Sequence, residues 1–140
     1  MGVFDPRGLV WWWRGPGLER PWAMNVHDKE LNPVLDHVRV GQLMLNKGIW
    51  NGKRILPAEW IEACITPCPI APGYGYLWWL NTTDNKIFPT ASNSAFFALG
   101  VGSQVLYIDP ENNLVIVVRW IEKDRIANFV EKVLSALSTS

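Results

Sequence analysis

The fold is decided by one stretch of the sequence, Val105-Leu106-Tyr107-Ile108-Asp109-Pro110-Glu111-Asn112-Asn113-Leu114-Val115-Ile116-Val117-Val118. Residues 105–108, and residues 114–120 apart from Arg119, are apolar and rich in β-branched and aromatic side chains, which favours two strands. The five residues between them are typical of a tight turn, so the stretch predicts an antiparallel hairpin. Residues 114–118 are apolar without alternation, which predicts a strand that is covered on both faces.

Two further strands are expected upstream of this hairpin. Residues 74–80 are rich in aromatic side chains, and residues 95–99 form a second short apolar run. The proline-rich loop around residues 67–72 separates them from the helical part of the chain. Together the four segments predict an antiparallel sheet of about four strands.

Helices are expected before and after the sheet. Asn32 is a good N-cap, Pro33 suits a first helical position, and Gly48 closes the helix in a left-handed conformation. Asn51-Gly52 then predicts a tight turn, and a second helix opens at residues 57–61 and ends before Thr66.

The last segment has the clearest helical period. Asp124 is the expected N-cap, and the apolar side chains recur at helical spacing on one face. These side chains are Ile126, Phe129, Val130, Val133, Leu134 and Leu137. The fold class predicted is therefore α+β, an antiparallel sheet flanked by helices on one or both faces.

Composition limits the function classes. The chain has 140 residues, 49% hydrophobic and 19% charged, with 13 basic and 13 acidic residues. This balance gives no attraction to nucleic acid, and no apolar run is long enough to span a membrane. No signal peptide is recognisable, so a cytoplasmic location is the default expectation. Residues 1–31, irregular and rich in Trp, Gly and Pro, are expected to precede one domain over residues 32–140.

Metal and cofactor sites are not predicted. Cys64 and Cys68 form one C-x3-C pair, while His27 and His37 lie far upstream, so two reduced thiols packed near a helix end are favoured. Phosphate-loop, dinucleotide, H-E-x-x-H and G-x-S-x-G patterns are all missing from the sequence.

Two features each leave two interpretations open. Nine tryptophans, including Trp78-Trp79, fit either a sugar-stacking platform or an aromatic core. The segment from Ala98 to Gln104 holds glycines at a strand end, which allow either close approach of a ligand or a tight corner between strands.

An ordered set of segments carries a resemblance to a known family. The segments are residues 40–60 (VGQLMLNKGIWNGKRILPAEW), 72–80 (PGYGYLWWL), 103–110 (SQVLYIDP) and 114–120 (LVIVVRW). In this order the chain resembles, from about residue 35 to 137, the C-terminal part of serine β-lactamase-related hydrolases of the penicillin-binding-protein, class C β-lactamase and esterase type. The resemblance implies the C-terminal portion of the β-lactamase/transpeptidase-like fold.

The same resemblance implies which part of the active site is present. The family's S-x-x-K and Y-x-N motifs have no counterpart in the sequence, whereas Gly100-Val101-Gly102 falls where the family carries K-T-G or a variant of it. By that resemblance Gly100, Val101 and Gly102 line the substrate site, and the backbone N–H of Ser103 is an oxyanion donor. Ser103 itself is not expected to be a nucleophile, because no base is placed beside it.

The expected function follows from this partial motif set. The chain is expected to be a C-terminal fragment of such a hydrolase, inactive alone, acting on an ester or amide only if an N-terminal half is supplied. Incomplete sheet edges predict self-association. The alternative is an aromatic-rich binding module for glycan or peptidoglycan.

Overall fold

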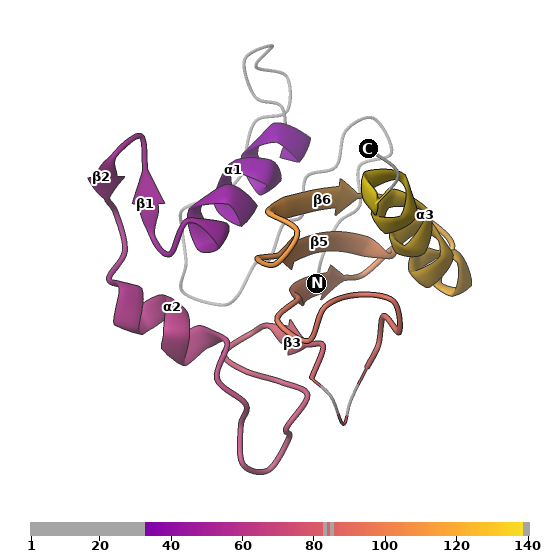
Figure 1. The fold of residues 1–140 in the computed structure, drawn as a ribbon, viewed down its shortest axis with the longest axis horizontal. Coiled ribbons are helices and arrows are strands. Elements are labelled where there is room, and N and C mark those ends of the chain that lie inside the picture. The colour runs from indigo at the N-terminus through magenta and orange to yellow at the C-terminus, as the bar shows by residue number, and fades with distance from the viewer. Residues whose placement is uncertain (1–32, 83, 85, 139–140) are drawn as a thin grey trace, which may run out of the picture. The chain divides into compact units, whose positions relative to one another are not determined.

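Antiparallel strand pairing organises the computed structural model, which describes residues 33–82, 84 and 86–138 (Figure 1). The strands of the main sheet are β3 (Trp79–Leu80), β4 (Phe96–Gly100), β5 (Gln104–Asp109) and β6 (Leu114–Val118). They are hydrogen-bonded in the order β3-β4-β5-β6, each antiparallel to the next. The predicted α+β class, with a four-stranded antiparallel sheet and helices beside it, is confirmed.

The hairpin predicted for residues 105–118 forms as expected. Tyr107 pairs with Ile116 and Asp109 pairs with Leu114, with the turn at residues 110–113 between them. The second strand is shorter than predicted, because β6 ends at Val118 and Trp120 already has a positive φ of 61°. A left-handed residue at this point turns the chain out of the strand.

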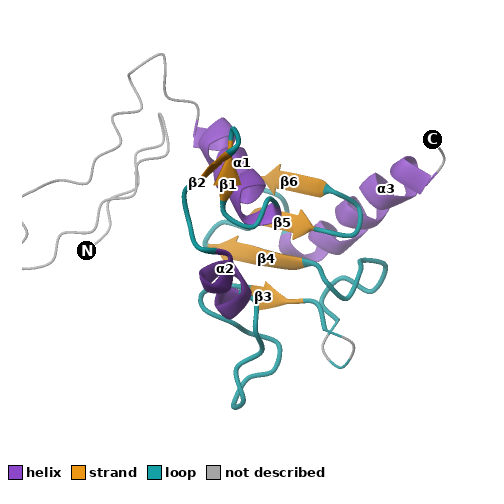
Figure 2. Cartoon of the chain, turned by 60° about the vertical axis from the view of Figure 1, so that its left-hand side comes forward, coloured by secondary structure: helices purple, strands orange, loops and turns teal. Residues whose placement is uncertain are grey.

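Helices cover both faces of the sheet. On one face, α1 (Pro33–Leu45) and α2 (Ala58–Cys64) contribute Met44 and Ile61 to a core with Leu106 and Ile108. Gly41 allows α1 to approach closely, because a Cβ there would lie 2.6 Å from a methyl group of Val115. On the other face, α3 (Ile126–Ser138) covers a second core. Figure 2 shows α1 and α2 on one side of the sheet and α3 on the other. The sheet thus separates two cores.

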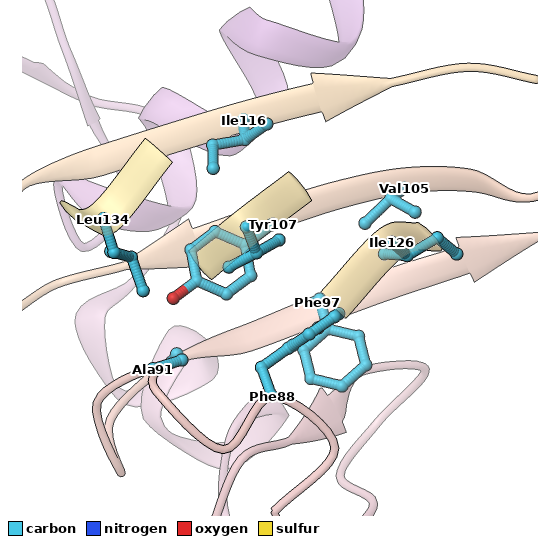
Figure 3. Packing of buried hydrophobic residues seen from close by; sticks show 10 residues of the cluster. Phe88, Ala91, Phe97, Val105, Tyr107, Ile116, Ile126 and Leu134 are labelled. Atoms are coloured by element: carbon cyan, nitrogen blue, oxygen red, sulfur yellow. The ribbon is translucent and has the colours of Figure 1, made fainter. Parts of the chain in front are cut away.

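The core under α3 is built around aromatic rings (Figure 3). Phe88 packs edge-on against Phe97 and Tyr107, with ring centroids 4.6 and 5.6 Å apart. Ile116 closes the β6 side of this cluster. Because Val115 and Val117 pack against the other core, β6 is covered on both faces, as its unbroken apolar run predicted.

The last helix differs from expectation at its start and on its flanks. A 3-10 helix, η1 (Lys123–Arg125), precedes α3, so Asp124 lies inside a turn and is not the N-cap of α3. Ile126, Val130 and Leu134 are buried, whereas Phe129 and Leu137 are 38% and 48% exposed. The apolar stripe is wider than the strip of sheet that the helix contacts.

The first helix and the turn after it follow the sequence prediction. Helix α1 is described from Pro33, and its proposed cap Asn32 lies outside the described residues. Gly48 has a φ of +83°, and a Cβ there would collide with the carbonyl oxygen of Leu56. Asn51 and Gly52 both have positive φ between the short strands β1 (Ile49–Trp50) and β2 (Lys53–Arg54), as an Asn-Gly turn requires.

The prediction of a strand over residues 74–80 is wrong for most of its length. Only Trp79 and Leu80 pair with β4, and Tyr74 forms an isolated bridge with Trp79. Between them Leu77 has a φ of +64°, and the Gly75 N–H donates to the carbonyl of Trp78. The aromatic-rich residues 74–78 therefore form a loop that folds back on itself, and the strand that follows is only two residues long.

Two remaining expectations concern the whole chain. No helix within residues 33–82, 84 and 86–138 is long and apolar enough to cross a bilayer. The Trp-, Gly- and Pro-rich segment over residues 1–31 lies outside the described residues. From residue 37 onward the chain forms one compact unit, to which the following description refers.

Candidate functional site

The four residues proposed from the sequence lie together at the tip of the β4–β5 hairpin. Gly100 ends β4 and pairs with Gln104, while Val101, Gly102 and Ser103 form the connecting turn. Gly102 and Ser103 have positive φ values of 79° and 55°. The glycines do form a tight corner between strands, and a non-glycine residue held at positive φ stores backbone strain there.

A tryptophan from the end of β6 supports this turn. A Cβ added to Gly102 would collide with atoms Cζ3 and Cε3 of the Trp120 ring, so the indole lies directly against the glycine backbone. Trp120 also has positive φ and is 46% exposed. Residues far apart in the sequence thus hold the glycine turn in one conformation.

A groove of about 200 Å³ opens beside the hairpin. Its apolar wall comes from Ala98, Leu106 and Val117, and Gly100 lies in it. Its polar groups come from His37 on α1, Gln104 and Arg119; the Nε atom of Arg119 is buried and makes no hydrogen bond within the described residues. Besides forming a corner, Gly100 therefore faces a space that a ligand group could enter.

Sequence reasoning missed Arg119 and Trp120 as neighbours of the glycine turn. The register places Val118 beside Val105, so the residues that follow β6 arrive next to the start of β5. The end of the apolar run at Val118 could have indicated this. In an antiparallel pair with β5, the two residues after Val118 must lie near the start of β5, and so near the tip of the β4–β5 hairpin.

The described residues contain no group of three or more His, Cys, Asp or Glu side chains that could hold a metal ion. Cys64 is buried at the end of α2 and Cys68 is half-buried; both thiols are free, as the sequence indicated. Burial raises the pKa of the Cys64 thiol, which makes it a poor nucleophile.

A buried carboxylate at the other end of β5 makes the densest polar cluster. Asp109 is fully buried, and its oxygens accept hydrogen bonds from the hydroxyls of Tyr107 and Ser92, each at 2.8 Å, and from Asn112 Nδ2 at 2.9 Å. The backbone N–H groups of Glu111 and Asn112 also donate to it, at 3.2 and 3.3 Å. These donors come from β5 itself, from the β5–β6 turn and from the loop before β4.

The pKa values in this cluster follow from those contacts. Burial alone raises the pKa of Asp109, but the hydrogen bonds from Asn112, Ser92 and Tyr107 outweigh it and hold the pKa below its usual range. Burial, together with the neighbouring Asp109, raises the pKa of Tyr107 far above its usual range. The cluster keeps a stable carboxylate and a neutral phenol, which suits fixing a turn rather than transferring protons.

A second buried polar side chain fixes the loop between β3 and β4. Asn81 is fully buried; its Nδ2 donates to the carbonyls of Phe88 at 3.1 Å and Ser92 at 2.9 Å, and its Oδ1 accepts from the Phe88 N–H at 3.0 Å. These bonds position Phe88 over the sheet and Ser92 beside Asp109. Both buried polar groups are therefore structural.

Comparisons with known proteins find a likeness among solved structures. A scan against models of protein families finds no match, and a search of curated proteins finds none either. Among solved structures, the chain described as "Putative 6-aminohexanoate-dimer hydrolase from Bacillus anthracis" is 32% identical, with a TM-score of 0.48. The likeness covers 76% of this chain and 27% of that one, so the present chain spans about a quarter of its length.

The first prediction concerns Asp109. In Asp109→Asn, the new amide N–H group points at groups that themselves donate hydrogen bonds, so at least one hydrogen bond is lost. We therefore expect the free energy of unfolding at neutral pH to fall by about 1–3 kcal/mol. Because the pKa of Asp109 is lower in the folded than in the unfolded protein, its carboxylate stabilises the fold fully at pH values above the unfolded-state pKa of about 3.9. This stabilisation is lost as the pH falls through the folded-state pKa. The deficit of the variant should therefore shrink as pH falls below about 4.

Urea unfolding at several pH values measures this difference. Asp124→Asn, in the exposed turn before α3, is the control and should match the unchanged protein throughout. A deficit of Asp109→Asn that stays constant down to acidic pH would contradict the account.

The second prediction concerns the glycine turn. Gly102→Ala and Gly52→Ala both place a Cβ at positive φ, 79° and 75°, but the Cβ at residue 52 meets no atom within 4 Å. Backbone strain should cost each variant about 1–3 kcal/mol. Gly102→Ala must also displace the Trp120 ring, so it should be the less stable variant and should shift the fluorescence of that indole. Equal stabilities would show that Trp120 does not support the turn.

Proposed function

We propose that this chain supplies the carboxyl-terminal part of a β-lactamase-related serine hydrolase, including one side of its active site. The observation that carries the proposal is the hairpin tip at Gly100–Ser103, which ends a sheet strand beside a groove and follows the resembling segments in family order. The similar chain from Bacillus anthracis is itself described as a hydrolase.

The proposed chemistry is acyl transfer to a serine followed by hydrolysis of an ester or amide. A nucleophile from outside these 140 residues attacks the carbonyl carbon, and the oxygen that becomes negative accepts a hydrogen bond from the Ser103 backbone N–H. Glycine at position 100, which lines the groove, leaves room for the carbonyl group to approach the backbone. Arg119 places a cation in the same groove.

The motifs that are missing from the sequence limit what the chain does alone. No Ser is followed three residues later by Lys, and no Tyr is followed two residues later by Asn or Ser. Without an activated nucleophile, oxyanion stabilisation and binding give only a small residual rate. The absence of Lys from the K-T-G-like segment favours an esterase-like or peptidase-like relative over one that binds the carboxylate of a β-lactam.

Self-association remains part of the proposal. Strands β3 and β6 are the two edges of the sheet, and near the hairpin tip Leu99 is 40% and Val101 78% exposed. Apolar surface beside a sheet edge favours a second chain, either another copy or an upstream segment of the hydrolase.

Glycan binding is the second candidate, and the exposed tryptophans bear on it. Trp79 lies on β3 and Trp120 just after β6, at opposite edges of the sheet, while Trp78 packs against Phe96 next to the core. Trp79 and Trp120 therefore do not join into one stacking platform, and Trp60 on α2 pairs with Tyr76 instead, with ring centroids 6.0 Å apart. The separation of Trp79 from Trp120 favours the hydrolase proposal.

The test uses the chain with and without an upstream segment. The 140-residue chain should neither hydrolyse nitrophenyl esters or nitrocefin nor take a fluorophosphonate label. Translation of the parent nucleic acid upstream of Met1 should give an in-frame S-x-x-K, and the joined chain should be labelled at that Ser. Stoichiometric labelling of one Ser in the short chain, abolished by its change to Ala, would overturn the proposal, as would an upstream frame without S-x-x-K.

A further inference from the structure

A second cavity lies on the β3 side of the sheet, away from the β5–β6 hairpin. It has a volume of about 410 Å³ and is lined by Ala71, Pro72, Gly73, Tyr74, Trp79 and Asp84; it is called the Tyr74 pocket below. Figure 2 shows the two loops that contribute to it, one between α2 and β3 and one after β3. This volume is within the range of small-molecule sites.

Two aromatic rings form a corner in this pocket. The rings of Tyr74 and Trp79 are 4.9 Å apart at an interplanar angle of 72°. The backbone bridge between the same residues holds the pair together, and the Trp79 side chain remains 38% exposed. Two π systems at a large angle present electron-rich surface from two directions, which suits a compact positive group.

Backbone hydrogen bonds keep the corner rigid. The Tyr74 N–H donates to the carbonyl of Ala71 at 2.9 Å, and the Tyr74 carbonyl accepts from the Cys68 N–H at 2.8 Å. The Leu80 N–H donates to Gly73 at 2.9 Å, which ties the loop to β3. A ligand would therefore meet preformed walls and lose little binding energy to ordering them.

The charge in the pocket comes from Asp84. Among the described residues no hydrogen bond or ion pair engages this exposed carboxylate. The ammonium of Lys86, two residues further along the chain, donates to the carbonyl of Ala91 at 3.3 Å, in the loop that Asn81 holds. The carboxylate is thus available to a cation from solvent.

We propose that the Tyr74 pocket binds a small organic cation, an alkylammonium or quaternary ammonium group. Such a group contacts both aromatic rings by cation–π attraction while the Asp84 carboxylate balances its charge. A neutral sugar would stack on one ring and gain little from the second ring and the charge. This inference does not rest on the proposed hydrolase function, because the pocket contains none of the residues at the Gly100–Ser103 hairpin.

The experiment is an NMR titration of the full chain with choline and with 3,3-dimethyl-1-butanol, its uncharged isostere. Choline should give saturable shifts at the Tyr74 and Trp79 signals, with at least about fivefold higher affinity than the isostere. Trp79→Ala should weaken choline binding about 3- to 30-fold and Asp84→Asn about 2- to 5-fold. Trp60→Ala and Glu59→Gln, exposed side chains on α2, are the controls and should leave it unchanged.

Asp84→Asn keeps the test decisive if Trp79→Ala destabilises β3, because an exposed carboxylate can change to its amide without loss of packing. Equal affinity for the charged and uncharged compounds would overturn the proposal. So would binding of N-acetylglucosamine in place of choline, or choline binding that Asp84→Asn leaves unchanged.

Discussion

Strand β5 is the element on which the rest of the structure depends. It is hydrogen-bonded to β4 on one side and β6 on the other, and residues 105–109 are all buried. Alternate side chains point to opposite faces, so Val105 and Tyr107 enter the core under α3 while Leu106 and Ile108 enter the core under α1 and α2. Neither helical layer could pack without this strand, because both cores share it.

The two ends of β5 also carry the polar features of the molecule. At its start Gln104 pairs with Gly100, so the strand fixes the hairpin that bears the proposed oxyanion donor. At its end Asp109 collects hydrogen bonds that tie the following turn to the loop holding Phe88. The stability of the fold and the geometry of the proposed site therefore depend on the same six-residue strand.

Local signals in the sequence were sufficient for much of this fold. The β5–β6 hairpin, the Asn51-Gly52 turn and the left-handed Gly48 after α1 depend on neighbouring residues, whose backbone preferences are readable one by one. Features that depend on distant partners were not predictable in this way. The hydrogen bond from Ser92 to Asp109 joins residues 17 positions apart. The contact of Trp120 with Gly102 requires the sheet to exist first.

The same reasoning explains why the site was only partly predictable. Gly100 and Gly102 could be singled out because glycine at the end of a strand usually marks either a tight corner or a close approach of a ligand. Arg119 reaches the groove only through the register of β6, which the sequence alone does not give. The aromatic segment before β3 is not a strand because it folds back at Leu77, which has a positive φ. Leucine rarely adopts this conformation, so the sequence gives no signal of the fold-back. The fold-back produces the Tyr74–Trp79 corner.

Amide hydrogen exchange, followed residue by residue, tests the central role of β5 most directly. If both cores depend on this strand, the amides of Leu106 to Ile108 should exchange only by global unfolding, and those of the β1–β2 hairpin by local opening at far lower free energy. Rapid exchange in β5, with slower exchange in α1 or the β1–β2 hairpin, would contradict the account.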